Sequence, residues 1–307
     1  MSDVKKDIDA KAIGFGLIGF GEAGRAIAHS LLQQQPAISI TAYDKLFDEG
    51  IATIEPINGV HFVDNPAECA DASDIIFSVV TADEATNAVT SLMPYLKARH
   101  IIADGNSVSP GTKRHNARLI DTSGATYIDM AIMAPIHPRG HKTPLLLSGK
   151  GEEVIAPILQ ELDFSFAWEG TGIGDASIVK MLRSILIKGM ECIITESVTA
   201  SQELGLDTRI LQSAGKTLGI ADMEGLADYV MERAAVHGRR RAAEMREVAK
   251  TLDELGLSNE MASATARYQD LIADMNLADK FHADVPVDRQ KLAPAMRTAQ
   301  RNNESDI

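Results

Sequence analysis

The sequence predicts an N-terminal doubly wound α/β domain followed by an all-helical domain. Between residues 12 and 168, apolar strand-like runs alternate with helix-like segments, which is typical of a mostly parallel sheet covered on both faces. The glycine-rich joint Glu169–Gly174 ends this alternation, and strand-like runs almost vanish after it. We therefore expect two domains, at residues 1–172 and 173–307.

Seven strands are expected in the first domain. They are Ala12–Gly19, Ile38–Asp44, Ser73–Val80, His100–Asn106, Thr126–Ile132, Pro144–Lys150 and Phe164–Trp168. Helix-like sequence occupies Glu22–Gln35 and Ala82–Ala98. In the second domain, long helical periodicities are expected to break at five glycines, Gly205, Gly219, Gly225, Gly238 and Gly256.

The composition is that of an ordinary globular protein, with 45% hydrophobic and 24% charged residues in a chain of 307. No run of about eighteen apolar residues occurs, so no membrane span is expected. The net charge of −13 argues against a nucleic-acid partner, because phosphate contacts require a cationic face. The one dense basic run, His237–Arg241, is expected to be a solvated helix face.

The cysteines and the N-terminus bear on the compartment. Cys69 and Cys192 lie far apart and near no metal-ligand pattern, so neither a disulfide nor a metal site is expected. Residues 1–11 are polar and lack the apolar region of an export signal. The expected location is therefore the cytoplasm.

A dinucleotide-binding fingerprint, G-x-G-x-x-G, closes the first expected strand. Its residues, all expected to bind the cofactor, are Gly19, Phe20, Gly21, Glu22, Ala23 and Gly24. Gly19 allows a tight turn, Gly21 lets the backbone approach a pyrophosphate, and Gly24 lets helix and strand pack closely. The following helix N-terminus would face the phosphates. A tight turn without a ligand is the alternative, which the strand–fingerprint–helix context disfavours.

The end of the second strand bears on the choice of dinucleotide. A carboxylate at Asp44 would accept hydrogen bonds from the adenosine ribose and repel a 2′-phosphate. NAD is therefore favoured, while the adjacent Lys45 leaves NADP as an alternative. Val80 and Thr81, at the end of the third strand, are also expected to contact the cofactor.

A polar stripe distinguishes the segment Asp175–Ser201, whose mostly apolar circumference predicts a largely buried helix. Steps of three and four residues place on one narrow face Ser177, Lys180, Ser184, Lys188, Glu191 and Thr195. Lysines in such a helix either face a polar cavity or are snorkelling or paired with Glu191. Lysine is also the cation whose pKa falls most readily on desolvation, which allows it to act as a general base.

These features resemble the β-hydroxyacid dehydrogenase superfamily, whose members join a Rossmann-type domain to a helical domain that often builds a dimer. Asp104–Ser107 is similar to the D-G-G-N-S segment of the 6-phosphogluconate branch, which implies that Asn106 and Ser107 touch cofactor and substrate. A turn that caps the next helix fits the same residues. Gly174–Met181 resembles the catalytic-lysine helix, which implies that Lys180 takes the hydroxyl proton as hydride leaves for the nicotinamide.

Departures from the family pattern bear on the substrate. Arg183 and Ser184 replace an asparagine-bearing pair, and Ile187 stands where the phosphogluconate branch has an acidic proton donor. Asp129–Pro135 corresponds to the D-A-P-V-S-G-G loop but lacks its Ser-Gly-Gly part. These differences argue against 6-phosphogluconate and 3-hydroxyisobutyrate as substrates and indicate a side branch of the superfamily.

Cationic side chains are candidates for holding an anionic substrate, because guanidinium groups bind carboxylates and phosphates in bidentate fashion. The expected substrate contacts are Asn106, Ser107, Arg183, Ser184, Lys188 and Arg240. The loop after Pro135 adds three residues for which an ordinary loop role is the alternative: His137, Arg139 and His141.

The expected activity is hydride transfer between a nicotinamide dinucleotide and a small, anionic hydroxy acid, with Lys180 as general acid/base. One alternative is an imine reductase of the same fold, against which the retention of Lys180 argues. The other is a dinucleotide-binding sensor without turnover, because a fold does not determine a function. The resemblance also implies a homodimer built through the helical domain.

Overall fold

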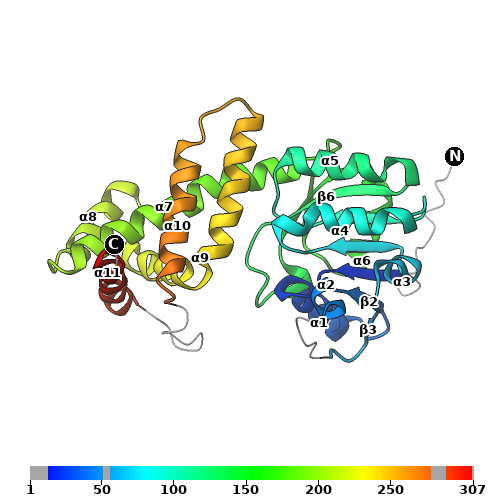
Figure 1. The fold of residues 1–307 in the computed structure, drawn as a ribbon, viewed down its shortest axis with the longest axis horizontal. Helices are drawn as coiled ribbons and strands as arrows, with labels where there is room; N and C mark the ends of the chain where they lie inside the picture. Colours follow the sequence, from blue (N-terminus) through cyan, green and yellow to red (C-terminus); the bar gives the residue numbers. More distant parts are fainter. Residues whose placement is uncertain (1–12, 51–55, 278–287, 306–307) are drawn as a thin grey trace. The chain divides into compact units, whose positions relative to one another are not determined.

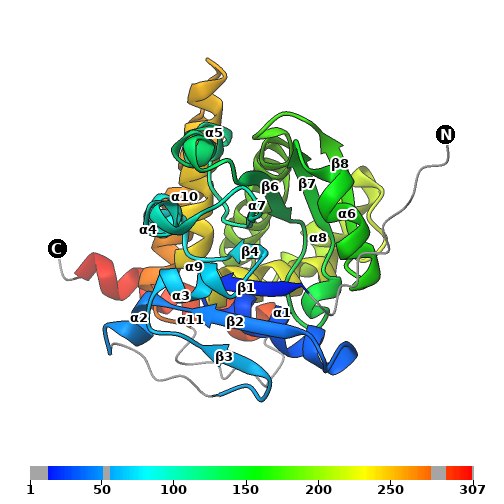
Figure 2. The same ribbon diagram turned by 90° about the vertical axis from the view of Figure 1, so that its right-hand side faces the viewer.

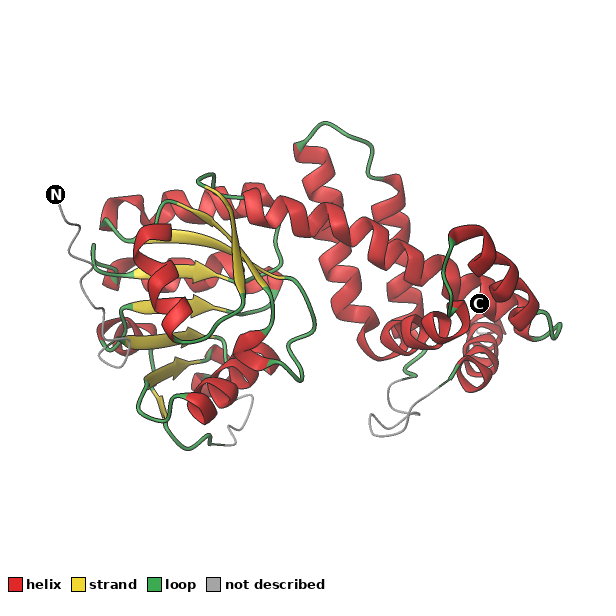
Figure 3. Ribbon diagram, turned by 180° about the vertical axis from the view of Figure 1, so that it is seen from behind, coloured by secondary structure: helices red, strands yellow, loops and turns green. Residues whose placement is uncertain are grey.

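The computed structural model describes residues 13–50, 56–277 and 288–305, and the chain divides into two compact units, Met1–Lys180 and Met181–Ile307. The first unit holds one eight-stranded sheet flanked by helices (Figure 1). The second contains helices and turns but no strand among its described residues (Figure 3). The predicted fold class, a doubly wound sheet followed by an all-helical region, is confirmed.

The sheet has the strand order β3-β2-β1-β4-β5-β6-β7-β8. Its strands are β1 (Gly14–Ile18), β2 (Ser39–Tyr43), β3 (Val60–Phe62), β4 (Ile75–Ser78), β5 (Ile101–Asp104), β6 (Thr126–Ile132), β7 (Leu145–Gly149) and β8 (Phe166–Gly170). All neighbours are parallel except β6 and β7, which are antiparallel. The seven predicted strands are present with ends that differ by a few residues. The additional strand, β3, is too short to show an apolar pattern.

Helices cover both faces of the sheet (Figure 2). They are α1 (Glu22–Gln34), α2 (Lys45–Asp48), α3 (Pro66–Asp71), α4 (Ala85–Leu92), α5 (Pro110–Ile120) and α6 (Glu152–Glu161). One core, containing Phe15 and Phe77, is closed by α1 and α6, and the opposite core, containing Ile76 and Ile102, by α3, α4 and α5. Successive strand residues point to opposite faces, so near-continuous apolar strands supply both cores.

The segment Ala82–Ala98 is not the single helix that its pattern predicts. One 3-10 turn, Ala82–Glu84, precedes α4, and another, Met93–Tyr95, follows it. Pro94 lies in the second turn and has no amide hydrogen with which to continue the α-helical bonding, so the regular helix ends at Leu92.

The helices of the second part of the chain are α7 (Asp175–Gln202), α8 (Asp207–Leu218), α9 (Met223–Glu254), α10 (Glu260–Asp274) and α11 (Arg289–Ser305). Three of the predicted breaks lie in turns after helices and have positive φ: Gly205, Gly219 and Gly256. The predicted breaks at Gly225 and Gly238 are wrong, because both lie inside α9. A Cβ at Gly238 would stand 2.8 Å from the carbonyl oxygen of Gln269, so this glycine lets α9 and α10 pack closely.

The prediction that α7 is largely buried is wrong, because its apolar residues do not all face inward. A row of large apolar side chains is exposed: Leu182, Leu186, Ile187, Met190 and Ile193. Much of the polar stripe is buried instead, namely Ser177, Ser184, Lys188, Glu191 and Thr195. Hydrophobic periodicity identified the helix, but it did not identify the side that the rest of the protein covers.

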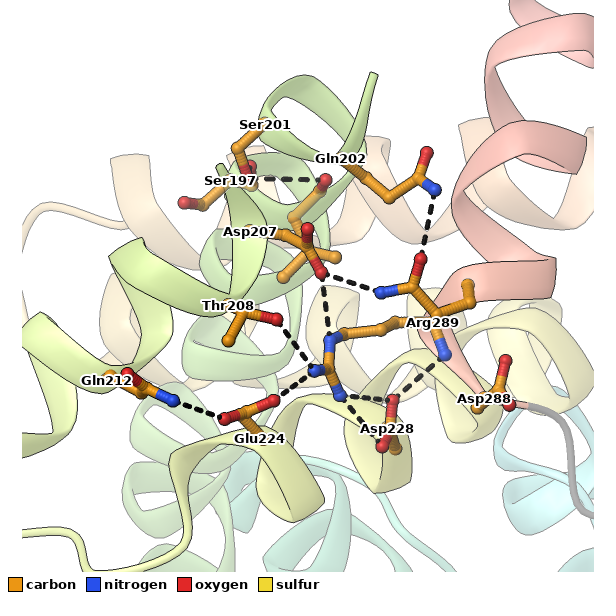
Figure 4. Close-up of polar contacts among 12 residues, drawn as sticks. Ser197, Ser201, Gln202, Asp207, Thr208, Gln212, Glu224, Asp228, Asp288 and Arg289 are labelled. Carbon is orange, nitrogen blue, oxygen red and sulfur yellow. Dashed lines mark hydrogen bonds and ion pairs between the residues drawn. The ribbon is translucent and has the colours of Figure 1, made fainter. Parts of the chain in front are cut away.

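Ion pairs connect the start of α11 to α8 and α9 (Figure 4). The guanidinium of Arg289 bonds to the carboxylates of Asp207 at 3.1 Å, Asp228 at 3.0 Å and Glu224. Arg289 is only 8% exposed, and three surrounding carboxylates offset the cost of removing its charge from water. The cluster joins residues up to 82 positions apart, so no local sequence pattern indicates it.

Candidate functional site

The predicted fingerprint forms the turn between β1 and α1. Gly19 has a φ of +94°, which glycine adopts at little cost. A Cβ at Gly24 would lie 2.3 Å from the carbonyl oxygen of Gly19, so a side chain there would push α1 away from the turn. No atom lies within 4 Å of a Cβ built at Gly21, the N-cap residue, and no side chain caps α1. The open backbone and helix start fit a pyrophosphate.

The remaining fingerprint residues have different surroundings. The Phe20 side chain is buried and packs edge-on against Phe62, with ring centroids 4.8 Å apart. Glu22 is exposed and Ala23 is half-buried at the start of α1. Phe20 can therefore meet a cofactor only through its backbone.

Two backbone amides orient the carboxylate of Asp44, which directly follows β2. It accepts a hydrogen bond from the Phe20 amide at 2.6 Å and another from the Leu46 amide at 3.0 Å. The first bond ties the end of β2 to the fingerprint turn, and the second caps α2. Asp44 thus stands where a Rossmann-type domain holds a ribose.

Asn106 connects the loops that follow β4 and β5. Its side-chain oxygen accepts the Val80 amide at 2.7 Å, and its side-chain nitrogen donates to the Ser78 hydroxyl at 3.0 Å. Its own amide donates to Asp104 at 2.9 Å. Thr81 is exposed at the start of the 3-10 turn before α4. Both ends of the Asn106 side chain therefore have partners in the protein, which leaves it limited capacity for a ligand.

The structure brings Lys180 and Ser107 together across 73 residues of sequence. The Lys180 amine donates to the Ser107 hydroxyl at 2.6 Å, and both residues are half-buried. The cap of α5 is Ser109, whose hydroxyl accepts the Thr112 amide at 3.2 Å. Helix capping therefore does not account for the loop residue Ser107.

The substrate contacts expected beyond Lys180 lie in the second unit. The Lys188 amine pairs with Glu244 at 2.6 Å and donates to Ser184 at 3.3 Å. Its carboxylate partner is thus Glu244 and not Glu191, the partner named in the alternative of a paired lysine. Arg183 and Arg240 are both exposed. Within this unit, Ser184 and Lys188 are therefore brought together.

The basic run around Arg240 does not form a uniformly solvated face. Arg239 is exposed and pairs with Asp274 at 2.5 Å. Arg241 is buried and pairs with Glu191 at 2.5 Å. Consecutive residues point about 100° apart around a helix, so Arg239 and Arg241, two positions apart, point to nearly opposite sides. One basic run therefore supplies both a surface and an interior ion pair.

The loop between β6 and β7 packs against α1. His141 is buried, and its Nδ1 atom lies 2.6 Å from the Ser30 hydroxyl. Burial lowers the pKa of His141. His137 and Arg139 are exposed. These contacts support the alternative of an ordinary structural role for His141.

The two cysteines are free and buried. Burial raises the pKa of Cys69 to about 11 and that of Cys192 to about 12. Within residues 13–50, 56–277 and 288–305, no group of histidine, cysteine, aspartate or glutamate side chains could hold a metal ion. No helix in the same ranges is long and apolar enough to cross a membrane.

Comparisons with known proteins agree with this architecture. Residues 14–160 match the NAD binding domain of 6-phosphogluconate dehydrogenase, and residues 201–272 match a domain of unknown function, DUF1932. A conserved hypothetical protein from Sinorhizobium meliloti 1021 is 30% identical, with a TM-score of 0.71, over 94% of this chain and 96% of that one.

Similar proteins include enzymes. A 2-(hydroxymethyl)glutarate dehydrogenase from Eubacterium barkeri is 27% identical over 68% of this chain and 70% of its own length. A 3-hydroxyisobutyrate dehydrogenase from Mycobacterium tuberculosis, at 13% identity, shares the fold with a TM-score of 0.68 over 93% of this chain and 98% of that one. Imine reductases also have this fold. The chain belongs to the β-hydroxyacid dehydrogenase superfamily, and it joins a 6-phosphogluconate dehydrogenase-like NAD-binding domain to a DUF1932 domain.

Proposed function

We propose that this protein catalyses the NAD-dependent oxidation of a small, anionic hydroxy acid, with Lys180 as general acid/base. The observation that carries the proposal is the 2.6 Å hydrogen bond between Lys180 and Ser107. Ser107 follows β5, and the fingerprint follows β1. The carboxyl ends of parallel strands share one edge of the sheet, which is where such domains bind ligands.

Each residue has a distinct part in the proposed reaction. In its neutral form, the Lys180 amine accepts the proton of the substrate hydroxyl, and in the reverse direction it returns that proton. Ser107 holds the amine through its hydroxyl oxygen and can donate its own O–H to the hydroxyl oxygen of the substrate. A bound NAD, which the fingerprint turn and Asp44 would hold, would supply the hydride acceptor. The protein itself must therefore bind and orient the substrate and the cofactor, and it must transfer one proton.

The surroundings of Asp44 support NAD as the preferred cofactor. The carboxylate is held in place by two amides, and the neighbouring cation Lys45 is drawn to Glu84 at 3.6 Å and Glu49 at 3.9 Å. The carboxylate of Asp44 would repel a 2′-phosphate, and the pairs of Lys45 with Glu84 and Glu49 reduce the attraction that this lysine would offer it.

The substrate class is supported by the 2-(hydroxymethyl)glutarate dehydrogenase relative, whose substrate carries a primary alcohol and two carboxylates. For this chain we propose Arg183, Lys188 and Arg240 as the cations that hold a carboxylate. Because Lys188 already pairs with Glu244, Arg183 is the residue from which we expect the strongest effect on substrate KM.

A homodimer built through the helical domain is supported by the exposed row on α7. Its members are Leu182, Leu186, Ile187, Met190 and Ile193, and Leu186 is 68% exposed. Aligned apolar side chains at helical spacing on a surface mark an interaction site, because their contact with water is unfavourable. A second copy of α7 would offer the same row.

The test measures nicotinamide absorbance with a panel of 3-hydroxy acids that includes 2-(hydroxymethyl)glutarate, offered with NAD and with NADP. Lys180→Met should lower kcat by about 100- to 10,000-fold, with little change in NADH affinity, because it removes only the proton acceptor. Lys142→Met is the matched control, since this exposed lysine pairs with Asp163 in the same unit. Full activity in Lys180→Met would refute the assignment of the base.

Binding of NADH without turnover of any hydroxy acid would favour one of the alternatives. Turnover of cyclic imines with NADPH or NADH would identify an imine reductase. If Lys180→Met altered no measurable property of a protein that still binds the dinucleotide, the sensor would be favoured.

A further inference from the structure

A row of four polar side chains crosses strands β4 to β7 at one level. The register pairs Ser78 with Asp104, Asp104 with Asp129, and Asp129 with Ser148, over the strands β4 to β7. Side chains at paired positions lie on the same face of a sheet. All four residues have a fractional exposure of 0%. Two carboxylates at such a place require compensation, because a buried charge without partners is costly.

Lys113, on α5, provides the compensating charge. This lysine is also 0% exposed, and its amine lies 2.9 Å from Asp104 Oδ1 and 3.5 Å from Asp129 Oδ1. The Tyr127 hydroxyl donates to Asp104, and the Asn116 side chain does so at 3.4 Å. One cation between two carboxylates leaves a net charge of −1, so Asp129 still requires donors.

The first turn of α7 supplies those donors. Asp129 accepts the Ser177 amide at 2.9 Å and the Ser177 hydroxyl at 2.6 Å. The neighbouring Ser148 hydroxyl accepts the Ala176 amide at 3.1 Å. The first amides of a helix have no partner within the helix, and a carboxylate near them is favourable. Side chains on strands β6 and β7 therefore cap the helix that carries Lys180.

The same row holds the loop that carries Ser107. Asp104 accepts the Asn106 amide at 2.9 Å, and Ser78 accepts the Asn106 side chain at 3.0 Å. Ser107 is the next residue. Thus Asp104 orients the loop that carries the hydroxyl, Asp129 orients the helix that carries the amine, and Lys113 joins the two carboxylates.

We propose that Asp129 and Lys113 are positioning residues for Lys180, which lies about one helical turn beyond the Ser177 cap. The buried Asp104–Lys113–Asp129 cluster determines where the Lys180 amine stands relative to Ser107, without touching the substrate. The inference rests on the proposed role of Lys180. It accounts for two buried carboxylates and a buried lysine that neither the proton transfer nor cofactor binding requires.

The experiment compares Asp129→Asn, Asp129→Ala and Ser177→Ala with Ser73→Ala, which removes a buried hydroxyl of the same unit outside the row. Asp129→Asn removes one charge but keeps an oxygen for the Ser177 amide, and it leaves Lys113 paired with Asp104. Asp129→Ala removes the cap altogether. All of these variants are expected to fold, because Lys113 keeps Asp104 as its carboxylate partner in each of them.

The first readout is hydrogen–deuterium exchange of the peptide that covers residues 172–183. Exchange should be accelerated most in Asp129→Ala, less in Asp129→Asn and Ser177→Ala, and not at all in Ser73→Ala. The second readout is kcat with the hydroxy acid that the panel identifies. Asp129→Ala should lower it by about 10- to 100-fold, because small displacements of a catalytic group have effects of this size. The Kd for NADH should stay near wild type.

Unchanged exchange of residues 172–183 in Asp129→Ala would overturn the inference, and so would an equal fall in NADH affinity and kcat. The proposed function fails in a different way, through full activity in Lys180→Met. If Lys180→Met stays active while Asp129→Ala loosens the start of α7, the cap exists but Lys180 is not the base.

Discussion

Replacing Arg241 by methionine removes the ion-pair partner of a buried carboxylate in the helical unit. The Arg241 guanidinium and the Glu191 carboxylate lie 2.5 Å apart, and their side chains are only 9% and 2% exposed. Burial lowers the pKa of Arg241 and raises the pKa of Glu191, and the charge of each partner opposes the shift in the other. The charge on each of the two buried side chains is therefore stabilised by the opposite charge of its partner.

The magnitude follows from this geometry. Removing one member of a buried pair costs about 3–5 kcal/mol, because the remaining charge stays desolvated. For a unit of about 125 residues, this corresponds to a fall in Tm of roughly 10–20 °C. The double variant Arg241→Met/Glu191→Leu removes both desolvation costs and should return to within about 2 kcal/mol of wild type.

The assay is urea unfolding followed by far-UV circular dichroism, which detects loss of the helices. Arg239→Met is the matched control, since Arg239 comes from the same run but its side chain is 66% exposed. It should change the unfolding free energy far less than Arg241→Met does, because water screens an exposed ion pair. The reasoning is refuted if Arg241→Met is as stable as Arg239→Met, or if the double variant is less stable than Arg241→Met.

Three further predictions address the cofactor, pH and assembly. Asp44→Ser should raise the NADP-to-NAD ratio of kcat/KM by about 10- to 100-fold, because a carboxylate no longer repels the 2′-phosphate; an unchanged ratio would contradict the NAD assignment. Burial places the pKa of His141 below its unfolded value, so its contribution to stability is present above about pH 6.5 and is lost as the pH falls below it. The unfolding free energy of His141→Gln should therefore change less than that of wild type between pH 7 and 5, and parallel curves would count against this. Leu186→Lys should shift the protein from dimer to monomer in analytical ultracentrifugation, whereas a wild type that is already monomeric at micromolar concentration would disprove the dimer.

Local patterns determined the α/β architecture because their causes are local. Near-continuous apolar runs form strands that are buried on both faces, and glycine at Gly19 and Gly24 permits the turn and the close helix packing at the fingerprint. Breaks at Gly205 and Gly219 follow from their positive φ. Gly238 has no such requirement, which explains why helix α9 continues through it.

The candidate site shows the limit of such patterns. The sequence placed Lys180 on a polar stripe and Ser107 after a strand, but only the folded chain brings their polar atoms to 2.6 Å. Likewise, Asp104 and Asp129 each end or interrupt a separate apolar strand, and only the sheet register makes them neighbours that share Lys113.

By itself, the sequence determined the fold class, the dinucleotide fingerprint and the existence of the helix that carries Lys180. Each of these is indicated by patterns within single strands, turns and helices, where backbone geometry and hydrophobic periodicity dominate. Tertiary structure alone decided that the polar stripe of α7 faces inward, that Arg241 is buried while Arg239 is exposed, and that strands cap the lysine helix. These outcomes depend on desolvation and on partners far away in the chain, which a local pattern does not contain.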